Sequence, residues 1–247
     1  MRKLLLFIPI LIISCGESNI HYNEDGTINS EGSLVDGKKQ GEWKFYDSDG
    51  NVDEISNWVD DKTHGLSTTY FVDGSKKSEV TWNNGLINGT QKIWYESGQL
   101  MQEVVWENDI RNGSYQQWYE NGQLSEKGNF MNGVEDGAFE VYNDDGSMSQ
   151  QLIFKNGSRE GAASTFHTNG QLMSSGSFLN DMKVNEWRFY FADGTLKEVS
   201  NYSDGLTDGV TEYYYSNGQL KEKGEFKMNM KEGIWQFFDS TGVMTSE

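Results

Sequence analysis

Tyr214-Tyr215-Ser216-Asn217-Gly218-Gln219-Leu220 is the stretch of sequence that decides the fold. An Asn-Gly pair between apolar residues is typical of a tight turn that joins two β-strands. A two-residue loop here would place Tyr215 opposite Leu220. A three-residue loop, with Gly218 in the left-handed conformation, places Tyr214 opposite Leu220 instead. The aromatic residue that recurs in the other copies of this stretch is that of Tyr214, so the sequence predicts a β-hairpin with a three-residue loop.

The turn glycine of this stretch recurs every 24 residues along the chain. Its copies are Gly26, Gly50, Gly74, Gly98, Gly122, Gly146, Gly170, Gly194, Gly218 and Gly242. A second register with the same period runs from Gly41 to Gly233, and a third, from Gly37 to Asn229, holds only Gly, Asn or Asp. These three residue types best tolerate a positive φ angle. A fixed period of this kind indicates a tandem repeat, so we expect roughly nine to ten units over residues 21–247.

Large apolar residues recur at three positions of each unit: four before the turn glycine, two after it and eight after it. The glycines exclude a helix, and the alternating aromatic and β-branched residues favour strands. We expect a three-residue loop at Asn83-Asn84-Gly85 as well, which would pair Trp82 with Leu86. One face of the sheet would then collect Leu86, Trp94, Leu100, Val104 and Trp106. The predicted fold class is all-β: tandem 24-residue hairpin repeats forming an elongated, twisted antiparallel β-meander.

The first residues have the pattern of a targeting peptide. Arg2 and Lys3 precede an apolar run from Leu4 to Ile13 that is too short to span a bilayer as a helix. Ile12-Ile13-Ser14-Cys15 resembles a bacterial lipobox, which implies a signal peptide over residues 1–14, a lipid on Cys15 and a short tether over residues 15–20. The implied location is the bacterial cell envelope, at the outer membrane, periplasm or cell surface. An ordinary secretory signal with an incidental Cys15 is the alternative.

The charge of the chain narrows the classes of partner. Its formal net charge is -18, which argues against nucleic acid or an anionic lipid surface and favours a basic partner or simple solubility. No constellation of catalytic residues is present around His21, His64 or His167, so we expect neither enzymatic activity nor a cofactor. Acidic turns such as Asp47-Ser48-Asp49-Gly50 could suggest calcium, but their glycine comes too early for an EF-hand. Ordinary turn chemistry explains them, and no metal site is predicted.

The two faces of the predicted sheet differ in their regularity. The face with Trp94 is aromatic in every unit, and we expect it to be the structural one. The other face varies between units, and a varying face with aromatic clusters is a candidate for partner binding. The candidate residues are Trp187, Phe189, Phe191, Tyr213, Tyr215, Trp235 and Phe237. Packing within the sheet, or stacking on sugars, is the alternative use of these rings.

Two written-out units carry a resemblance to a known family. Gly89-Thr-Gln-Lys-Ile-Trp-Tyr-Glu-Ser-Gly-Gln-Leu and residues 209–224 look like the MORN repeat variant, which occurs in bacterial proteins often labelled the YwqK antitoxin family. The resemblance covers residues 21–247 and implies a structural and interaction module rather than an enzyme. It implies a lipid-anchored scaffold that binds an unidentified protein partner. The alternatives are an antitoxin or immunity protein that masks a basic toxin, and an envelope glycan-binding module.

Overall fold

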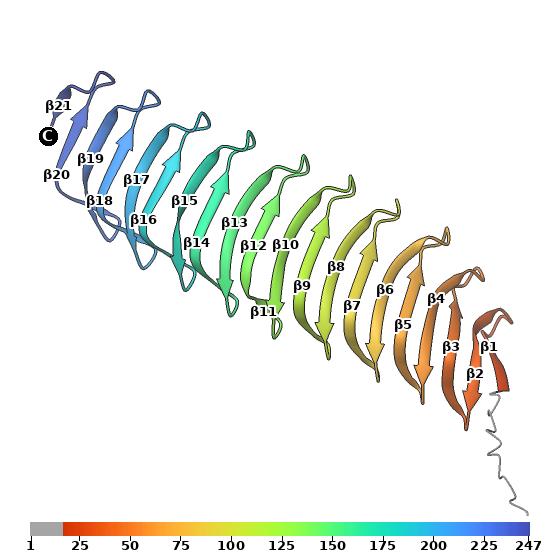
Figure 1. The fold of residues 1–247 in the computed structure, drawn as a ribbon. Coiled ribbons are helices and arrows are strands. Elements are labelled where there is room, and N and C mark those ends of the chain that lie inside the picture. Colours follow the sequence, from red (N-terminus) through yellow and green to blue (C-terminus); the bar gives the residue numbers. More distant parts are fainter. Residues whose placement is uncertain (1–16) are drawn as a thin grey trace, which may run out of the picture. The chain divides into compact units, whose positions relative to one another are not determined.

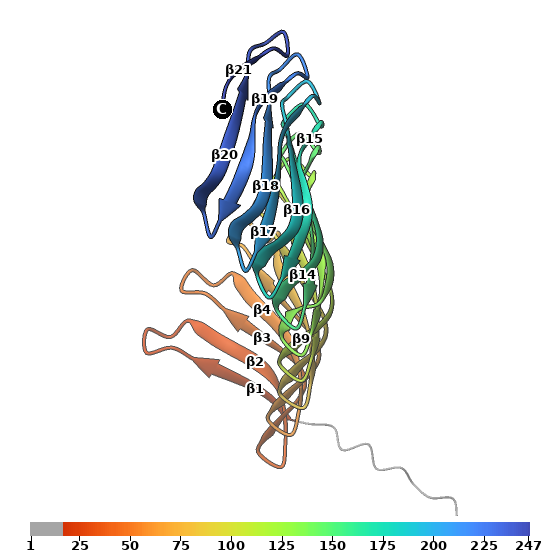
Figure 2. The ribbon, with the colours of Figure 1, turned by 90° about the vertical axis from the view of Figure 1, so that its left-hand side faces the viewer.

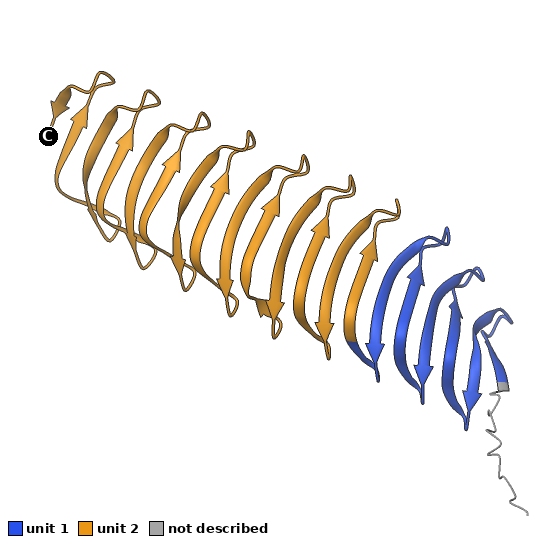
Figure 3. Cartoon of the chain, in the orientation of Figure 1, with its two compact units in different colours: residues 1–87 blue, residues 88–247 orange. Residues whose placement is uncertain are grey.

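The computed structural model describes residues 17–247, and its regular elements are all β-strands. The expected signal peptide over residues 1–14 and the expected lipidation site at Cys15 therefore lie outside the described residues. The chain divides into two compact units, residues 1–87 and 88–247, which are drawn in different colours in Figure 3. Each is described by itself.

Unit 1 contains six strands that follow one another along the chain (Figure 1). They are β1 (Glu17–Tyr22), β2 (Ile28–Val35), β3 (Lys38–Tyr46), β4 (Val52–Val59), β5 (Lys62–Tyr70) and β6 (Lys76–Asn83). Each strand pairs antiparallel with the next. β1 begins four residues before the predicted start of the array, because Glu17 to Ile20 already pair with β2. The expected tether over residues 15–20 is therefore largely part of the first strand.

Unit 2 continues the same pattern. Strand β7 (Leu86–Trp94) contains the division between the units, which falls after Ile87. It is followed by β8 (Leu100–Glu107), β9 (Ile110–Trp118), β10 (Leu124–Met131), β11 (Val134–Glu135), β12 (Gly137–Tyr142), β13 (Met148–Lys155), β14 (Ser158–Phe166), β15 (Leu172–Leu179), β16 (Met182–Tyr190), β17 (Leu196–Ser203), β18 (Leu206–Tyr214), β19 (Leu220–Lys227), β20 (Met230–Phe238) and β21 (Met244–Ser246). Consecutive strands pair antiparallel, except that β10 pairs with both β11 and β12. The predicted all-β, antiparallel meander of hairpins is confirmed within both units.

The three-residue loops are confirmed. Tyr214 pairs with Leu220, and the amide of Gly218 donates to the carbonyl oxygen of Tyr215 at 2.9 Å. Trp94 pairs with Leu100 in the same way. The ten turn glycines all have positive φ, for example +87° at Gly122 and +83° at Gly218.

The second loop of each 24-residue repeat, such as the one between β8 and β9, has two residues rather than the predicted three. Glu107 pairs directly with Ile110, and the two residues between them, Asn108 and Asp109, have φ of +50° and +65°. Two consecutive positive φ angles define the type I′ turn, whose twist matches that of the flanking strands. Asn84 and Gly85 have the same signs of φ. The expected three-residue loop at Asn83-Asn84-Gly85 is therefore wrong.

A bulge after each three-residue loop changes which residues share a face. Trp94 pairs with Leu100, but Ile93 already pairs with Gln102, so that Met101 is left without a partner in the ladder. The extra residue moves Val104 and Trp106 to the face opposite Trp94 and Leu100. The predicted single apolar face is thus divided between two faces.

The core lies on the face that carries Trp43 in unit 1 and Trp187 in unit 2, which we call the core face. Trp43 is 0% exposed and Trp187 is 3% exposed, while Trp94 on the opposite face is only half-buried. The expectation that the face of Trp94 is the structural one is corrected by these exposures. A row of cross-strand neighbours on the core face, from Gly32 through Trp43 to Ser56 in unit 1, is the most buried part of the sheet.

In this row, a large side chain on one strand lies next to a small residue on the neighbouring strand. Four of the large aromatic rings each lie on a glycine: Trp43 on Gly32, Phe139 on Gly128, Trp187 on Gly176 and Trp235 on Gly224. A methyl group on Gly176 would come within 2.2 Å of the Trp187 ring. Where the row has the small residue Ala163, its neighbour is the larger Leu152. A single-layer sheet therefore excludes water from its centre by laying rings flat across adjacent strands.

Candidate interaction surface

An aromatic stripe runs beside the buried row on the core face. It contains one large ring in each of the strands that follow a three-residue loop from β4 to β19: Trp58 and Trp82 in unit 1, and Trp106, Phe130, Phe154, Phe178, Tyr202 and Phe226 in unit 2. Basic residues follow several of the two-residue turns: Lys39, Arg111, Arg159, Lys183 and Lys231. Trp106 pairs with Arg111 and Phe178 pairs with Lys183. Cationic side chains therefore lie beside several rings of the stripe.

Two lysines lie in cages of three rings. In unit 1 the Lys39 Nζ lies 4.6 Å from the Trp43 ring centre, 4.7 Å from Phe45 and 4.4 Å from Trp58. In unit 2 the Lys183 Nζ lies 4.3 Å from Trp187, 5.0 Å from Phe189 and 5.1 Å from Tyr202. The faces of the rings attract the ammonium groups.

Burial against these rings changes the electrostatics of both lysines. Loss of solvation lowers the pKa of Lys39 and of Lys183, against the opposing effect of nearby carboxylates. Those carboxylates are Asp61 and Glu54 around Lys39, and Glu198 near Lys183. Each cage thus offers a partly buried cation beside an acid, which is a polar anchor within an apolar surface.

The structure divides the seven predicted binding residues. Trp187 and Trp235 are 3% and 7% exposed and belong to the core, so they are not the free surface we expected. Their burial follows from the glycines beneath them and the aromatic stripe beside them.

The other five predicted residues lie in two places. Phe189, Tyr213 and Phe237 are half-buried on the core face, where Glu198 pairs with Phe189 and Tyr213, and Glu222 pairs with Tyr213 and Phe237. Burial, followed by the charges of these two acids, raises the pKa of Tyr213 to about 12. Phe191 and Tyr215 lie beside three-residue loops instead, and the Tyr215 hydroxyl donates to the carbonyl oxygen of Phe238 at 2.9 Å. Five of the seven residues are therefore brought onto one face.

Side-chain hydrogen bonds join successive 24-residue repeats at the edge of the sheet where the three-residue loops lie, which we call the loop edge. The hydroxyl of Tyr119 donates to the carbonyl oxygen of Tyr142, 23 residues further along, as Tyr215 does to Phe238. His167 occupies the same position, and its Nε2 lies 3.0 Å from the carbonyl oxygen of Tyr190. His167 thus has the structural role of the tyrosines that it replaces.

In the acidic turns, the aspartate side chains accept hydrogen bonds from backbone amides of the same turn. The Asp47 carboxylate accepts from the amides of Asp49 and Asn51, each at 2.9 Å. These bonds, with the one from the Asn51 side chain as the largest cause, lower the pKa of Asp47. Among residues 17–247 no three His, Cys, Asp or Glu side chains are grouped so as to hold a metal ion.

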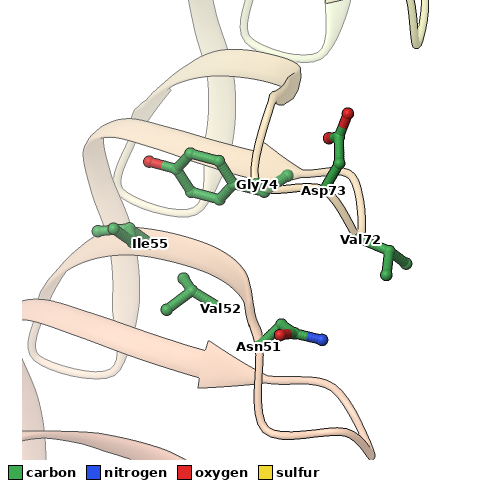
Figure 4. A pocket seen from close by; sticks show the side chains of 7 residues that line it. Asn51, Val52, Ile55, Val72, Asp73 and Gly74 are labelled. Atoms are coloured by element: carbon green, nitrogen blue, oxygen red, sulfur yellow. The ribbon is translucent and has the colours of Figure 1, made fainter.

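Unit 1 has an open depression on the face opposite its core (Figure 4). Its apolar lining comes from Val52, Ile55, Tyr70 and Val72, and its volume is about 340 Å³. Val72, the first residue of a three-residue loop, is 78% exposed. A depression of this kind can hold one apolar side chain of a partner, with Asp73 at its rim.

Sequence reasoning missed both the caged lysines and the glycines beneath the rings. A signal for the lysines was present, because Lys39, Lys183 and Lys231 stand in one register of the repeat. The glycines could have been found by comparing the two positions within each unit, since Gly32, Gly176 and Gly224 precede Trp43, Trp187 and Trp235 by eleven residues each.

Comparison with known proteins gives a family match. The model of the MORN repeat variant matches residues 39–60, 87–108, 111–132, 159–180, 183–204 and 207–228. Repeats of this family are not typically enzymatic. None of the curated proteins matches the chain. The part of the chain that the structure describes contains no helix long and apolar enough to span a membrane.

Solved structures show only a faint likeness. A crystal structure of TcdB2-TccC3 is 12% identical, with a TM-score of 0.22 over 90% of this chain and 15% of that chain. A crystal structure of TcdB2-TccC3-Cdc42 is 11% identical, with a TM-score of 0.16 over 92% of this chain and 18% of that chain. The chain thus spans less than a fifth of the length of these chains, and at such TM-scores the likeness carries no argument.

Proposed function

Because the chain belongs to the MORN repeat variant family, we propose that it is a non-enzymatic interaction scaffold of the bacterial cell envelope. In this proposal a lipid on Cys15 anchors the protein, and its repeat sheet binds a protein partner. MORN repeats are commonly interaction modules, which supports the class of function. The lipobox-like Ile12-Ile13-Ser14-Cys15 supports the anchor.

One observation carries the proposal: within each unit the core face has no second layer of described elements over it (Figure 1). Half-buried rings such as Phe189 and Tyr213 lie on that face beside the buried row, together with the caged Lys183. Aromatic rings contribute a large share of interface energy where a partner covers them near the centre of its contact. The ammonium group of the caged lysine would donate a hydrogen bond to an anionic group of the partner.

The charge of the chain supports a basic partner. A net charge of -18 would steer a positively charged protein toward the sheet and repel an acidic one. A basic toxin masked by this chain would be one such partner, and a genuine scaffold in the envelope would have others. Identification of the captured protein distinguishes these outcomes.

The anchor is tested by replacing Cys15. We expect the parent protein to remain with membranes through high-salt washes, because each buried CH₂ of an acyl chain contributes about 0.8 kcal/mol. Cys15→Ala should leave an unprocessed precursor or a soluble form. The measurement is membrane fractionation with intact-mass analysis, and identical processing and fractionation of the two proteins would refute the anchor.

The binding face is tested by a matched pair of double variants. Phe189→Ala with Tyr213→Ala removes two rings from the core face, whereas Tyr190→Ala with Tyr214→Ala removes their chain neighbours from the opposite face. We expect cross-linked capture of the envelope partner to fall at least about fivefold in the first double variant only. Circular dichroism and thermal melting of both proteins check the fold. Equal losses in both, or none in either, would contradict the proposed face.

A further inference from the structure

One residue at the loop edge of unit 1 departs from the repeat in a way that the fold does not require. Val72 is the first residue of a three-residue loop and is 78% exposed. The other nine residues at this position of the repeat are Glu, Ser, Asp, Thr or Ala. A single exposed apolar side chain is ordinary on a protein surface. Val72 is different because other apolar residues that also depart from the repeat lie beside it.

Ile55 is the second departure from the repeat. Its counterparts in the repeats before and after it are Glu31 and Glu79. In the preceding repeat, the Glu31 carboxylate accepts a hydrogen bond from the Tyr46 hydroxyl at 2.7 Å. In the next repeat, Ile55 stands in the place of that acid and Tyr70 in the place of the tyrosine. An aliphatic side chain therefore replaces one member of a hydrogen-bonded pair.

The two departures meet in the open depression of unit 1, on the face opposite the core. Val52, Ile55, Tyr70 and Val72 form its apolar lining, and its volume is about 340 Å³. The lining comes from β4, from the end of β5 and from the loop after β5 (Figure 4). Figure 2 shows the strands of unit 1 as a single layer. The described part of unit 1 therefore leaves the depression open to a partner.

The two loops that bound the depression are acidic. Residues 47–51 and 71–75 contain three aspartates, Asp47, Asp49 and Asp73, and no Lys or Arg. Asp73 lies at the rim of the depression, and Asp49 is exposed on the neighbouring loop. Hydrogen bonds from the side chain and the backbone of Ser75 lower the pKa of Asp73, which keeps its carboxylate charged. The rim therefore presents negative charge around an apolar floor.

The lysines of the neighbouring strands have contacts of their own. Lys76 is bonded to Glu79 at 2.6 Å, and Lys44 lies opposite Glu31 in the strand ladder. Lys77 lies 6.0 Å from the ring centre of a loop phenylalanine. None of the three is a residue of the two acidic loops or of the lining. A cation that meets the loop aspartates would therefore come from outside unit 1.

We propose that the depression binds one apolar side chain of a basic protein segment, whose neighbouring lysine or arginine residues meet Asp49 and Asp73. The apolar lining selects the inserted side chain, and the charged rim selects the residues beside it. A second copy of this chain is a poor occupant, because two chains with a net charge of -18 repel each other. The inference rests on the proposed scaffold function, since it assumes a basic protein partner, and adds a binding site on the other face of the sheet.

The test titrates the full chain with a pentapeptide that has one leucine between two pairs of lysines. The methyl NMR signals of Val52, Ile55 and Val72 should shift saturably. Two matched peptides separate the contributions: one has serine in place of the leucine, and the other has glutamates in place of the lysines. We expect each to bind at least about fivefold more weakly, because the first lacks the apolar side chain and the second is repelled.

Variants of the protein locate the binding site. Val72→Ser should remove the preference for the leucine peptide over the serine peptide, and it should keep the fold because Ser48 stands at the same position of the repeat. Leu66→Ser is the matched control, since Leu66 is 46% exposed but does not line the depression. Asp73→Asn should weaken binding of the leucine peptide about twofold, whereas Asp25→Asn, which removes the same charge two loops away, should not.

Three results would overturn the inference: equal affinity of the leucine and serine peptides, equal effects of Val72→Ser and Leu66→Ser, or methyl shifts confined to residues outside the depression. Self-association of the chain that Val72→Ser removes, measured by analytical ultracentrifugation, would identify a second copy as the occupant and would overturn it too. Each of these results leaves the capture contrast of Phe189 and Tyr213 intact, because those residues lie in unit 2. Loss of that contrast with an intact leucine preference would instead reject the core face as the binding surface.

Discussion

At the scale of single residues, the turns are the most constrained part of the chain. The first position of every two-residue turn has a positive φ, and eight of its nine occupants are Asp or Asn: Asp36, Asp60, Asn84, Asn108, Asn132, Asn156, Asn180 and Asp204. The ninth is Met228, with φ of +48°. Methionine has no short polar group that bonds locally to offset the left-handed conformation, so it is strained at this position.

Met228→Asn should therefore stabilise the protein. We expect its free energy of unfolding to rise by about 0.5–1 kcal/mol, since Asn tolerates the left-handed region better. Urea denaturation measures the change. The reciprocal control is Asn180→Met, at the equivalent turn with the same φ of +48°, which should lower stability by a similar amount. If neither variant differs from the parent, the turns do not hold strain at this position.

At the scale of strand pairs, rings lying on glycines hold the sheet together. Gly176→Ala should destabilise the protein by about 1–3 kcal/mol, because its methyl group would meet the Trp187 ring at 2.2 Å. Ser200→Ala, on the other side of the same ring, adds no atom and removes only the hydrogen bond that the Ser200 hydroxyl donates to Glu198, so it serves as the control for a change without a steric clash. Chemical denaturation of both variants measures the difference. Gly176→Ala combined with Trp187→Ala should lose the steric part of the cost, and a fully additive double variant would contradict it.

The strand pairs also show how far the sequence predicts this fold and its site. Period, strand content and the three-residue loop were predictable, because Gly218 needs positive φ and Tyr214 must face Leu220. The face on which Trp106 lies was not predictable. The bulge at Met101 cannot be recognised from the spacing of the apolar residues, yet it moves every following residue of the strand to the opposite face. Trp187 was therefore predicted to be exposed, although it is only 3% exposed and belongs to the core.

At the scale of the whole molecule, two opposing charge effects set the response to acid. The pKa of six loop aspartates is lowered from 3.8, chiefly by hydrogen bonds from neighbouring side chains in the loops: Asp25, Asp47, Asp73, Asp145, Asp193 and Asp239. A lowered folded-state pKa contributes stability that is present above the unfolded value of 3.8 and is lost as the pH falls through the folded pKa. The net charge of -18 acts in the other direction, because its repulsion weakens as the pH approaches the pI of 4.5.

We therefore expect stability to pass through a maximum near about pH 5 and to fall below about pH 4. Thermal melting between pH 8 and pH 3 measures both limbs. Added salt should flatten the rise between pH 8 and pH 5, which comes from long-range repulsion, and should leave most of the acid limb, which comes from local bonds. A melting temperature that keeps rising down to pH 3 would show that the loop aspartates contribute nothing.

The side-chain ladder on the loop edge has a consequence for how such genes change in length. Each rung, such as Tyr119 to Tyr142 or His167 to Tyr190, joins residues 23 positions apart. Duplication or loss of one whole 24-residue repeat would give the donor of every hydrogen bond in the ladder an equivalent acceptor. Loss of a single residue would instead misalign the repeats on either side of it. Recombination within this gene is thus tolerated only in steps of one 24-residue repeat, and homologous proteins should differ in length by multiples of 24 residues.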